Sequence, residues 1–266
     1  MGRTGSNLFQ YFACKLVCQL LGCHQYYHIK TFGIGATFND DTWEALTESD
    51  EPYSDPLFAP LRRSNIWMDG YFQDTRLFVK HRDLILDLLD NVGPNEKMGT
   101  RVIRSFFQTK CPLHLNESDL VLSLRLDDFY QSENSDGVSM VVPVDFYCRL
   151  LDSLDYDRLY IICDRIRHKW EERYLAKFDD YEPIHLIGGD LERDCAIMRT
   201  APRLIHSNST LCWINSFLTP TVKPKLERHI VQLTTDNVNR MGIINPETDT
   251  LHRVDPMTHT EINALR

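Results

Sequence analysis

An alternation of strand-like and helix-like segments in the second half of the chain constrains the fold more than any other feature. Four strand-like runs, DLVLSLRL, RLYIICD, PIHLIG and RLIHS, are each followed by a helix-like segment. Those segments are VPVDFYCRLLDSL, RHKWEERYLAKF, LERDCAIMRT and NSTLCWINSFL. Parallel strands need a crossover connection, which is usually a helix. The sequence therefore predicts an α/β fold with a Rossmann-like parallel sheet in this half.

The first half of the chain is less regular. LFQYFACKLVCQLL and QDTRLFVKHRDLILDLLD have helical spacing, QYYHI and IWMDGYF read as strands, and residues 31–65 show no clear period. The segment CPLHLNES contains Pro, Asn and Ser and marks a boundary between the two halves. We expect an N-terminal domain over 1–115, a C-terminal domain over 116–225, and a tail over 226–266 with one strand-like run.

Polar residues follow the strand-like runs of the second half. They are Arg125 with Asp127 and Asp128, then Asp164, and finally Ser207 with Asn208. In parallel sheets with crossover helices, ligands bind at the carboxyl ends of the strands. The guanidinium of Arg125 either offers a planar fork of donors to a pyrophosphate or forms a salt bridge with one of the two aspartates that follow it.

Two turns have the composition of an anion site at a helix N-terminus. In HSNSTLCW, Ser209 and Thr210 open a helix, and in the opening MGRTGSN the residues Gly2 and Gly5 precede a helix that Ser6 or Asn7 can cap. The free N–H groups of such a first turn bind phosphate. Both turns are equally compatible with an ordinary helix cap.

Charge and composition exclude several classes of protein. The formal net charge of −9 and the pI near 5.5 argue against non-specific nucleic-acid binding, which needs clustered Lys and Arg. No apolar run approaches the roughly 18 residues of a membrane span, and the eight cysteines form no C-x-x-C pair. We therefore expect a cytoplasmic protein with reduced cysteines and no metal site. The one Asp-x-Asp, Asp155-Tyr156-Asp157, precedes its strand rather than following it.

Six segments together resemble the α-1,2-fucosyltransferase family. GRTGSNLFQYFACKLVCQLLG is similar to the family's Gly-Arg-Leu-Gly-Asn-Gln-Met-Phe-Gln-Tyr-Ala opening, and MDGYFQDTRLF to its Gly-Tyr-Phe-Gln segment. LSLRLDDF stands where the family has His-x-Arg-Arg-Gly-Asp-Tyr, VPVDFYCRLL where it has Pro-x-x-Tyr-Tyr, and YIICDRI at its Ser-Asp-Asp strand end. DCAIMRTAPRLIHSNSTLCWINSFL resembles its Asp-Leu-x-x-Met…Ala-Asn-Ser-Ser-Phe-Ser-Trp-Trp segment. Order and spacing hold over about residues 1–220.

The resemblance implies a GT-B architecture, in which two Rossmann-like domains hold a nucleotide sugar in the cleft between them. It also implies metal-independent, inverting transfer of L-fucose from GDP-fucose to a hydroxyl of a glycan acceptor, with no cofactor besides that donor. Arg125 would then bind the donor β-phosphate and stabilise the leaving diphosphate, and Asp194 would accept hydrogen bonds from the guanine edge. The donor-binding set carried over is Gly2, Gly5, Ser6, Asn7, Ser123, Asp164, Asp194, Asn208, Ser209 and Thr210.

The sequence also departs from the family pattern. The family histidine is Ser123, its second arginine is Leu126 and its glycine is Asp127. Asp128 is either the general base toward the acceptor or an exposed loop carboxylate, and His206 either approaches the donor or is a core histidine. Two alternatives therefore stand beside fucosyl transfer: a transferase that uses another nucleotide-activated deoxyhexose such as rhamnose, and a non-catalytic sugar- or nucleotide-binding relative.

Overall fold

A computed structural model describes residues 4–21, 25–29, 33–37, 43–47, 65–69, 73, 75–90, 109–126, 129–130, 139–218, 226–235 and 241–266. The chain divides into two compact units, Met1–Gln108 and Thr109–Arg266. Each unit is described by itself below.

The first unit contains a mixed sheet and three described helices. The strands are β1 (Gln25–Ile29), β2 (Gly33–Thr37), β3 (Trp43–Thr47) and β4 (Asn65–Asp69), and the helices are α1 (Thr4–Leu21), α3 (Thr75–Lys80) and α4 (Arg82–Asp90). The strand order is β1-β2-β4-β3, and β2 runs antiparallel to both of its neighbours. The described strands therefore differ from the parallel sheet expected for a Rossmann-like domain over 1–115, because β2 runs opposite to the other three strands and β3 and β4 are the one described pair of neighbours that is parallel.

Helix α1 supplies much of the core of this unit. Phe9, Phe12 and Leu16 are almost fully buried, and they recur at the three- and four-residue spacing that places side chains on one helix face. The ring of Phe9 meets that of Phe78 in α3 edge to face, with their centroids 4.7 Å apart. The helix predicted for the opening segment is confirmed.

The second unit is built on a six-stranded sheet. Its strands are β5 (Asp119–Ser123), β6 (Arg158–Cys163), β7 (Ile184–Ile187), β8 (Arg203–Ile205), β9 (Glu227–Leu233) and β10 (Asp249–Val254). Every neighbouring pair is parallel, and the order is β10-β9-β8-β5-β6-β7. The chain adds β6 and β7 on one side of β5 and then crosses over to add β8, β9 and β10 on the other. This is the strand order of a doubly wound Rossmann-like sheet, so the predicted α/β fold with a parallel sheet is confirmed for this unit.

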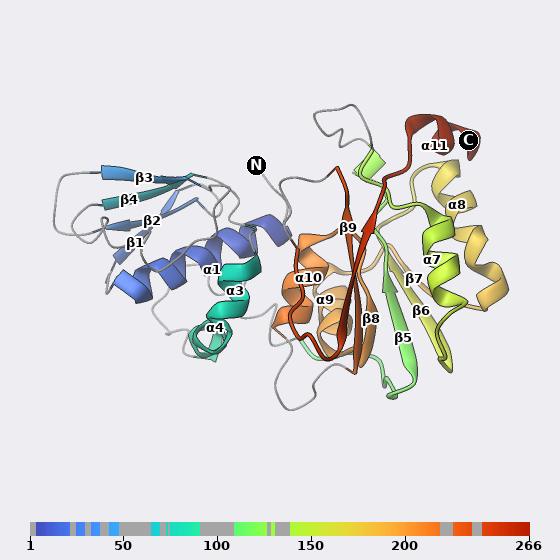
Figure 1. Ribbon diagram of the computed structural model, residues 1–266, viewed down its shortest axis with the longest axis horizontal. Helices are drawn as coiled ribbons and strands as arrows, with labels where there is room; N and C mark the ends of the chain where they lie inside the picture. The colour runs from blue at the N-terminus through green and yellow to red at the C-terminus, as the bar shows by residue number, and fades with distance from the viewer. Residues whose placement is uncertain are drawn as a thin grey trace. The chain divides into compact units, whose positions relative to one another are not determined.

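Helices cover both faces of this sheet. Figure 1 shows α7 (Val144–Leu151) and α8 (Lys169–Leu175) on one side, with α9 (Leu191–Thr200) and α10 (Thr210–Phe217) on the other. A short 3₁₀ helix, η2 (Ala176–Tyr181), continues α8, and α11 (His259–Ala264) lies near the end of the chain. Leu120 and Leu122 of β5 pack with α7 and α8, whereas Val121 and Ser123 alternate to the opposite face. All five residues of β5 are buried.

Residues 226–266 do not form a separate tail. β9 and β10 extend the parallel sheet, and α11 contributes Ile262 to the core cluster of the second unit. The strand-like run HIVQLTT correctly marks most of β9. The expectation of a separate tail fails because β10 follows β9 without a helix-like segment between them, so the alternating pattern that identifies the earlier strands is missing here.

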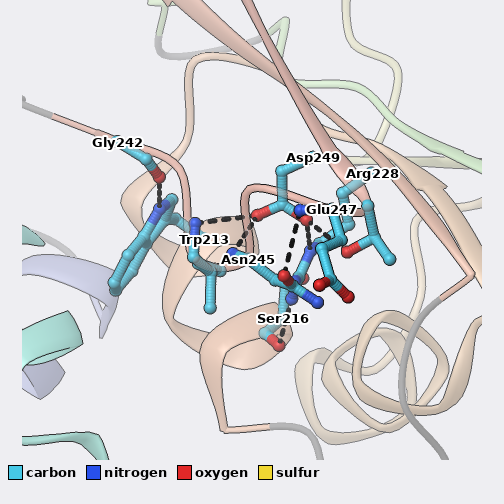
Figure 2. A network of polar contacts seen from close by, with 9 residues as sticks. Trp213, Ser216, Arg228, Gly242, Asn245, Glu247 and Asp249 are labelled. Atoms are coloured by element: carbon cyan, nitrogen blue, oxygen red, sulfur yellow. Dashed lines mark hydrogen bonds and ion pairs between the residues drawn. The ribbon is translucent and has the colours of Figure 1, made fainter.

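A buried ion pair fixes β9, β10 and their connection to α10. Arg228 Nε donates to Asp249 Oδ1 at 2.6 Å, and the exposed fractions of the two side chains are only 7% and 0%. Asp249 also accepts hydrogen bonds from the backbone N–H groups of Ile244 and Asn245 at 2.7 and 2.9 Å. Figure 2 shows this network, in which Arg228 also reaches Ser216 of α10. The carboxylate is therefore compensated entirely from within the protein.

Replacing Asp249 with alanine should lower the free energy of unfolding by about 3–5 kcal/mol, because it leaves the buried Arg228 guanidinium uncompensated. Urea unfolding followed by circular dichroism measures this loss. Glu247→Ala is the control, since Glu247 lies in the same connection but is exposed, and it should change the free energy by less than about 0.5 kcal/mol. Equal effects of the two substitutions would show that the Arg228–Asp249 pair is not what holds this region together.

Candidate functional site

The strand order of the second unit identifies one place where a ligand is expected. The order reverses at β5, with β6 on one side and β8 on the other. Crossover connections leave the sheet in opposite directions at such a point, and ligands of doubly wound folds bind outside the carboxyl ends of the strands there. The residues that follow β5, β6, β7 and β8 therefore form the candidate site.

Arg125 and Asp164 meet at the carboxyl ends of β5 and β6. Arg125 Nη1 donates to Asp164 Oδ1 at 3.3 Å, and Arg125 Nε lies 3.2 Å from Asp164 Oδ2. The parallel register explains this contact, because Ser123 pairs with Ile162 and each of the two charged residues lies two positions further on. The side chains retain exposed fractions of 14% and 31%. The partner of Arg125 seen here is thus Asp164, while Asp127 and Asp128 lie outside the described residues.

The chain around Arg125 has the burial that the sequence predicts. Leu124 and Leu126 are buried in the core cluster on the α7 and α8 face. The Arg125 guanidinium also lies over the ring of Phe129, 5.6 Å from its centroid. The side chain is therefore held from two directions at the end of a rigid strand.

A two-glycine turn after β7 is a part of the site that the sequence analysis missed. Gly188 has φ +64°, a conformation that L side chains rarely adopt, and its N–H donates to Cys163 O. A Cβ at Gly189 would stand 1.7 Å from Arg193 Nη2, so the guanidinium lies directly over this glycine. The Gly-Gly pair immediately after a strand-like run was the available signal.

Arg193 and Asp194 form an ion pair next to this turn. Arg193 donates from Nε and Nη2 to Asp194 Oδ1 at 3.0 and 2.8 Å. Burial raises the pKa of the Asp194 carboxyl, the nearby Asp164 and Asp190 carboxylates raise it further, and Arg193 opposes the shift. Asp194, the residue expected to meet a guanine edge, is thus already hydrogen-bonded within the protein.

The first turns of α9 and α10 differ in charge. Asp190 caps α9 by accepting from Glu192 N at 3.0 Å, and the first turn of α9 contains Glu192 and Asp194. Ser209 caps α10, where no acidic residue occupies the first turn. Because a helix N-terminus carries a partial positive charge, the α10 end attracts an anion more strongly than the α9 end, whose own acids already offset that charge.

The predicted residues around α10 are mostly buried. Asn208 Oδ1 accepts from Leu233 N at 3.3 Å, and Ser209 Oγ accepts from Cys212 N at 3.5 Å. Ser123, His206, Asn208 and Ser209 each have an exposed fraction below 9%, while Thr210 is half-buried. The cap interpretation of the HSNSTLCW turn is confirmed, because Ser209 accepts from an N–H group of the first turn of α10.

The opening glycine motif differs from the expected loop. Gly5 and Ser6 lie inside α1, which begins at Thr4, and Ser6 Oγ accepts from Gln73 Nε2 at 2.7 Å. The expected glycine loop is therefore absent at Gly5, because the helix starts one residue earlier. Gly2 and the side chain of Asn7 lie outside the described residues.

Two other sequence expectations concern metal and cysteine. Asp155 and Asp157 precede β6, at the amino edge of the sheet, and Asp157 Oδ2 accepts from Ser118 Oγ. Where the structure is described, no group of three His, Cys, Asp or Glu side chains is arranged to hold a metal ion. The described cysteines, Cys14, Cys111, Cys148, Cys163, Cys195 and Cys212, are all free. Burial raises the pKa of the Cys163 and Cys195 thiols.

Comparison of the chain with protein-family models, with curated proteins and with solved structures gives no match. Within the described ranges, no helix is both long enough and apolar enough to cross a membrane.

Substituting Gly189 with alanine should push the Arg193 guanidinium off Asp194, because the new Cβ would occupy its place. Arg193 opposes the upward shift of the Asp194 pKa, so this pKa should rise further. Carbon-13 NMR titration of the Asp194 carboxyl measures the change. At Gly188 a Cβ would keep 3.6 Å from Arg165, so Gly188→Ala should leave that pKa in place while costing about 1–2 kcal/mol of stability through its positive φ. An unmoved Asp194 pKa in the Gly189 variant would contradict this arrangement.

Proposed function

We propose that the protein is an inverting glycosyltransferase and that its second unit binds the diphosphate of a nucleotide sugar at the carboxyl ends of β5 and β8. GDP-fucose is the first-choice donor, and a hydroxyl of a glycan is the acceptor. The choice of fucose rests on the resemblance of the six sequence segments to the α-1,2-fucosyltransferase family. The choice of location rests on the geometry of the sheet.

The observation that carries the proposal is the combination of Arg125 with the first turn of α10 at the point where the strand order reverses. β5 and β8 are adjacent parallel strands, so the residues that follow them emerge at the same edge of the sheet. One supplies a guanidinium and the other a helix N-terminus without acidic side chains. Both groups stabilise a diphosphate, which suits a site for the donor rather than for the neutral acceptor.

Arg125 would act when the glycosidic bond breaks. Negative charge then develops on the departing diphosphate, and a planar guanidinium can bind two of its oxygens at once. Asp164 contacts Nη1 and Nε of Arg125 and thereby holds the guanidinium at the end of β5. Because both side chains keep some solvent exposure, a phosphate can share the guanidinium with this carboxylate without the cost of opening a sealed pair.

The finer parts of the proposal come from the resemblance. A GT-B arrangement would give the first unit the acceptor side, although its described strands form a mixed sheet. Asp128 remains the candidate general base. A donor with another deoxyhexose, or a nucleotide-binding relative without catalysis, would use the same diphosphate site, and the experiments below distinguish these alternatives.

Arg125→Ala should weaken GDP binding about 10- to 150-fold, the effect of losing one charge-assisted hydrogen bond. Arg125→Lys should fall between this variant and the wild type, since an ammonium cannot form the bidentate contact. Isothermal titration calorimetry with GDP, UDP and dTDP measures the affinities, and a thermal melt checks the fold. Arg149→Ala is the control. Arg149 is exposed in the last turn of α7, and its substitution changes the net charge of the protein by the same amount as Arg125→Ala.

Three results would count against parts of this assignment. A folded Arg125→Ala protein with wild-type affinity for GDP would show that Arg125 serves only as the partner of Asp164. Binding of UDP or dTDP at least as tight as that of GDP would replace fucose with another activated deoxyhexose. Nucleotide binding without hydrolysis of any nucleotide sugar would favour the non-catalytic relative.

Hydrolysis or transfer of the donor sugar should survive EDTA. The proposal assigns neutralisation of the diphosphate to Arg125 and the α10 N-terminus, and the one Asp-x-Asp pair lies at the opposite edge of the sheet, before β6. Release of GDP from GDP-fucose with and without EDTA measures this. Activity that disappears on chelation and returns with Mn²⁺ would make the enzyme metal-dependent and would remove the reason to assign this charge to protein groups alone.

A further inference from the structure

The outer strand β7 exposes apolar side chains on both faces of the sheet. Of the large apolar side chains exposed among the described residues, Ile184, Ile187 and Leu191 lie in β7 or just after it, with exposed fractions of 44%, 40% and 40%. Ile184 pairs with Tyr160 and Ile187 with Cys163 of β6, positions that alternate across the sheet. Among the described residues, the helices thus leave Ile184 and Ile187 partly exposed on the two faces of this outer strand, and an outer strand favours pairing with another strand.

The backbone of β7 has its remaining hydrogen-bonding groups at two residues. Gly188 directs its N–H toward β6, where it bonds Cys163 O at 3.1 Å. Backbone N–H groups alternate in direction along a strand, so those of His185 and Ile187 point away from β6. Pro183, next in this series, has no N–H. A strand added at this edge must therefore bond to His185 and Ile187.

We propose that β7 pairs antiparallel with β7 of a second copy of this chain, so that two six-stranded sheets join about a two-fold axis. The axis passes through Leu186. His185 of each copy then exchanges backbone hydrogen bonds with Ile187 of the other, and the two Leu186 side chains face each other in a closely spaced, non-hydrogen-bonded pair. This register uses both outward N–H groups and avoids Pro183. It is isologous, as the commonest dimers are.

Charge at the two ends of β7 favours a second copy running in the antiparallel direction. Asp179, Asp180 and Glu182 are exposed before the strand and outnumber the one exposed lysine there, Lys177, whereas Arg165 and Arg167 are exposed in the connection that follows the neighbouring strand β6. Arg165 lies near the carboxyl end of β7, where it approaches Gly188. Antiparallel pairing brings the acidic end of one copy to the basic residues of the other. Asp190 and Glu192 also lie at the carboxyl end, where the N-terminus of α9 offsets their charge.

Sedimentation velocity of the full chain tests whether β7 mediates a dimer. The wild type should show a monomer–dimer equilibrium, and Ile184→Lys should weaken it at least about tenfold by placing a charge in the apolar contact. Ile243→Lys is the matched control, because Ile243 is equally exposed, at 40%, but lies outside β7. The proposal is overturned if the wild type stays monomeric, or if the Ile184 and Ile243 variants dimerise equally well.

Cysteine cross-linking tests the register itself. In Leu186→Cys the two new thiols would face each other across the axis, with Cα atoms about 4.5 Å apart, within the range that a disulfide spans. Mild oxidation should therefore link this variant into dimers on a non-reducing gel. Ile184→Cys, two residues from the axis, should link no better than the wild type. Equal linking of both variants, or none, would refute this register, and capture of a different protein without self-association would assign the edge to another partner. The inference does not depend on the proposed activity.

Discussion

The burial of β5 on both faces and its parallel pairing on both edges is the constraint on which the second unit depends. Leu120, Val121 and Leu122 are fully buried, and the strand bonds to β6 on one side and β8 on the other. A strand enclosed in this way has no freedom of register, because a slip by one residue would move every side chain to the opposite face. Arg125 lies two residues after the end of this strand. Its position is therefore determined by the packing of β5 in the core rather than by the loop in which it lies.

Two ion pairs in this unit show how burial decides what a charge can do. Arg228 and Asp249 are sealed from water and surrounded by donors from the protein, so their interaction offsets a large desolvation cost and holds two strands and a helix together. Arg125 and Asp164 have the same chemistry but remain partly exposed. Because solvent reaches that second pair, its ions are only partly desolvated, and the arrival of an anion beside Arg125 costs less than it would at the sealed pair. The sealed pair is therefore structural, whereas the open pair keeps the solvent access that the proposed diphosphate site requires.

The sequence predicted the parts of the fold in which local pattern and burial coincide. The four strand-like runs after residue 118 correspond to β5 to β8, because each is apolar and is followed by an amphipathic helix. β10 escaped prediction because its residues are mostly half-buried or exposed and no helix-like segment precedes it in the sequence. In the first unit, the antiparallel direction of β2 depends on pairing between short segments and leaves no periodic trace in the sequence.

The candidate site was predictable residue by residue but not as an arrangement. Arg125 and Asp164 were identified because each ends an apolar run, yet their contact across two strands follows from a register that a single sequence does not contain. The turn at Gly188 and Gly189 was visible as a dipeptide, but the guanidinium above it comes from the following helix. Side chains from different elements are brought together by tertiary packing, and local sequence pattern does not predict such contacts.

The reversal of strand order also has a consequence for how the chain folds. Leu120 meets its partner Arg203 only after β6, β7 and the described helices α7, α8, η2 and α9 have been synthesised, with β6 and β7 on the other side of β5. The backbone edge of β5 that bonds to β8 therefore stays unpaired while most of this unit is synthesised. Contacts so distant along the chain close slowly, since the entropy of a long loop is lost before the pairing is gained. The central strand is thus the first of the sheet to be made and among the last to be completed, and in the interval between the two its unpaired edge favours aggregation.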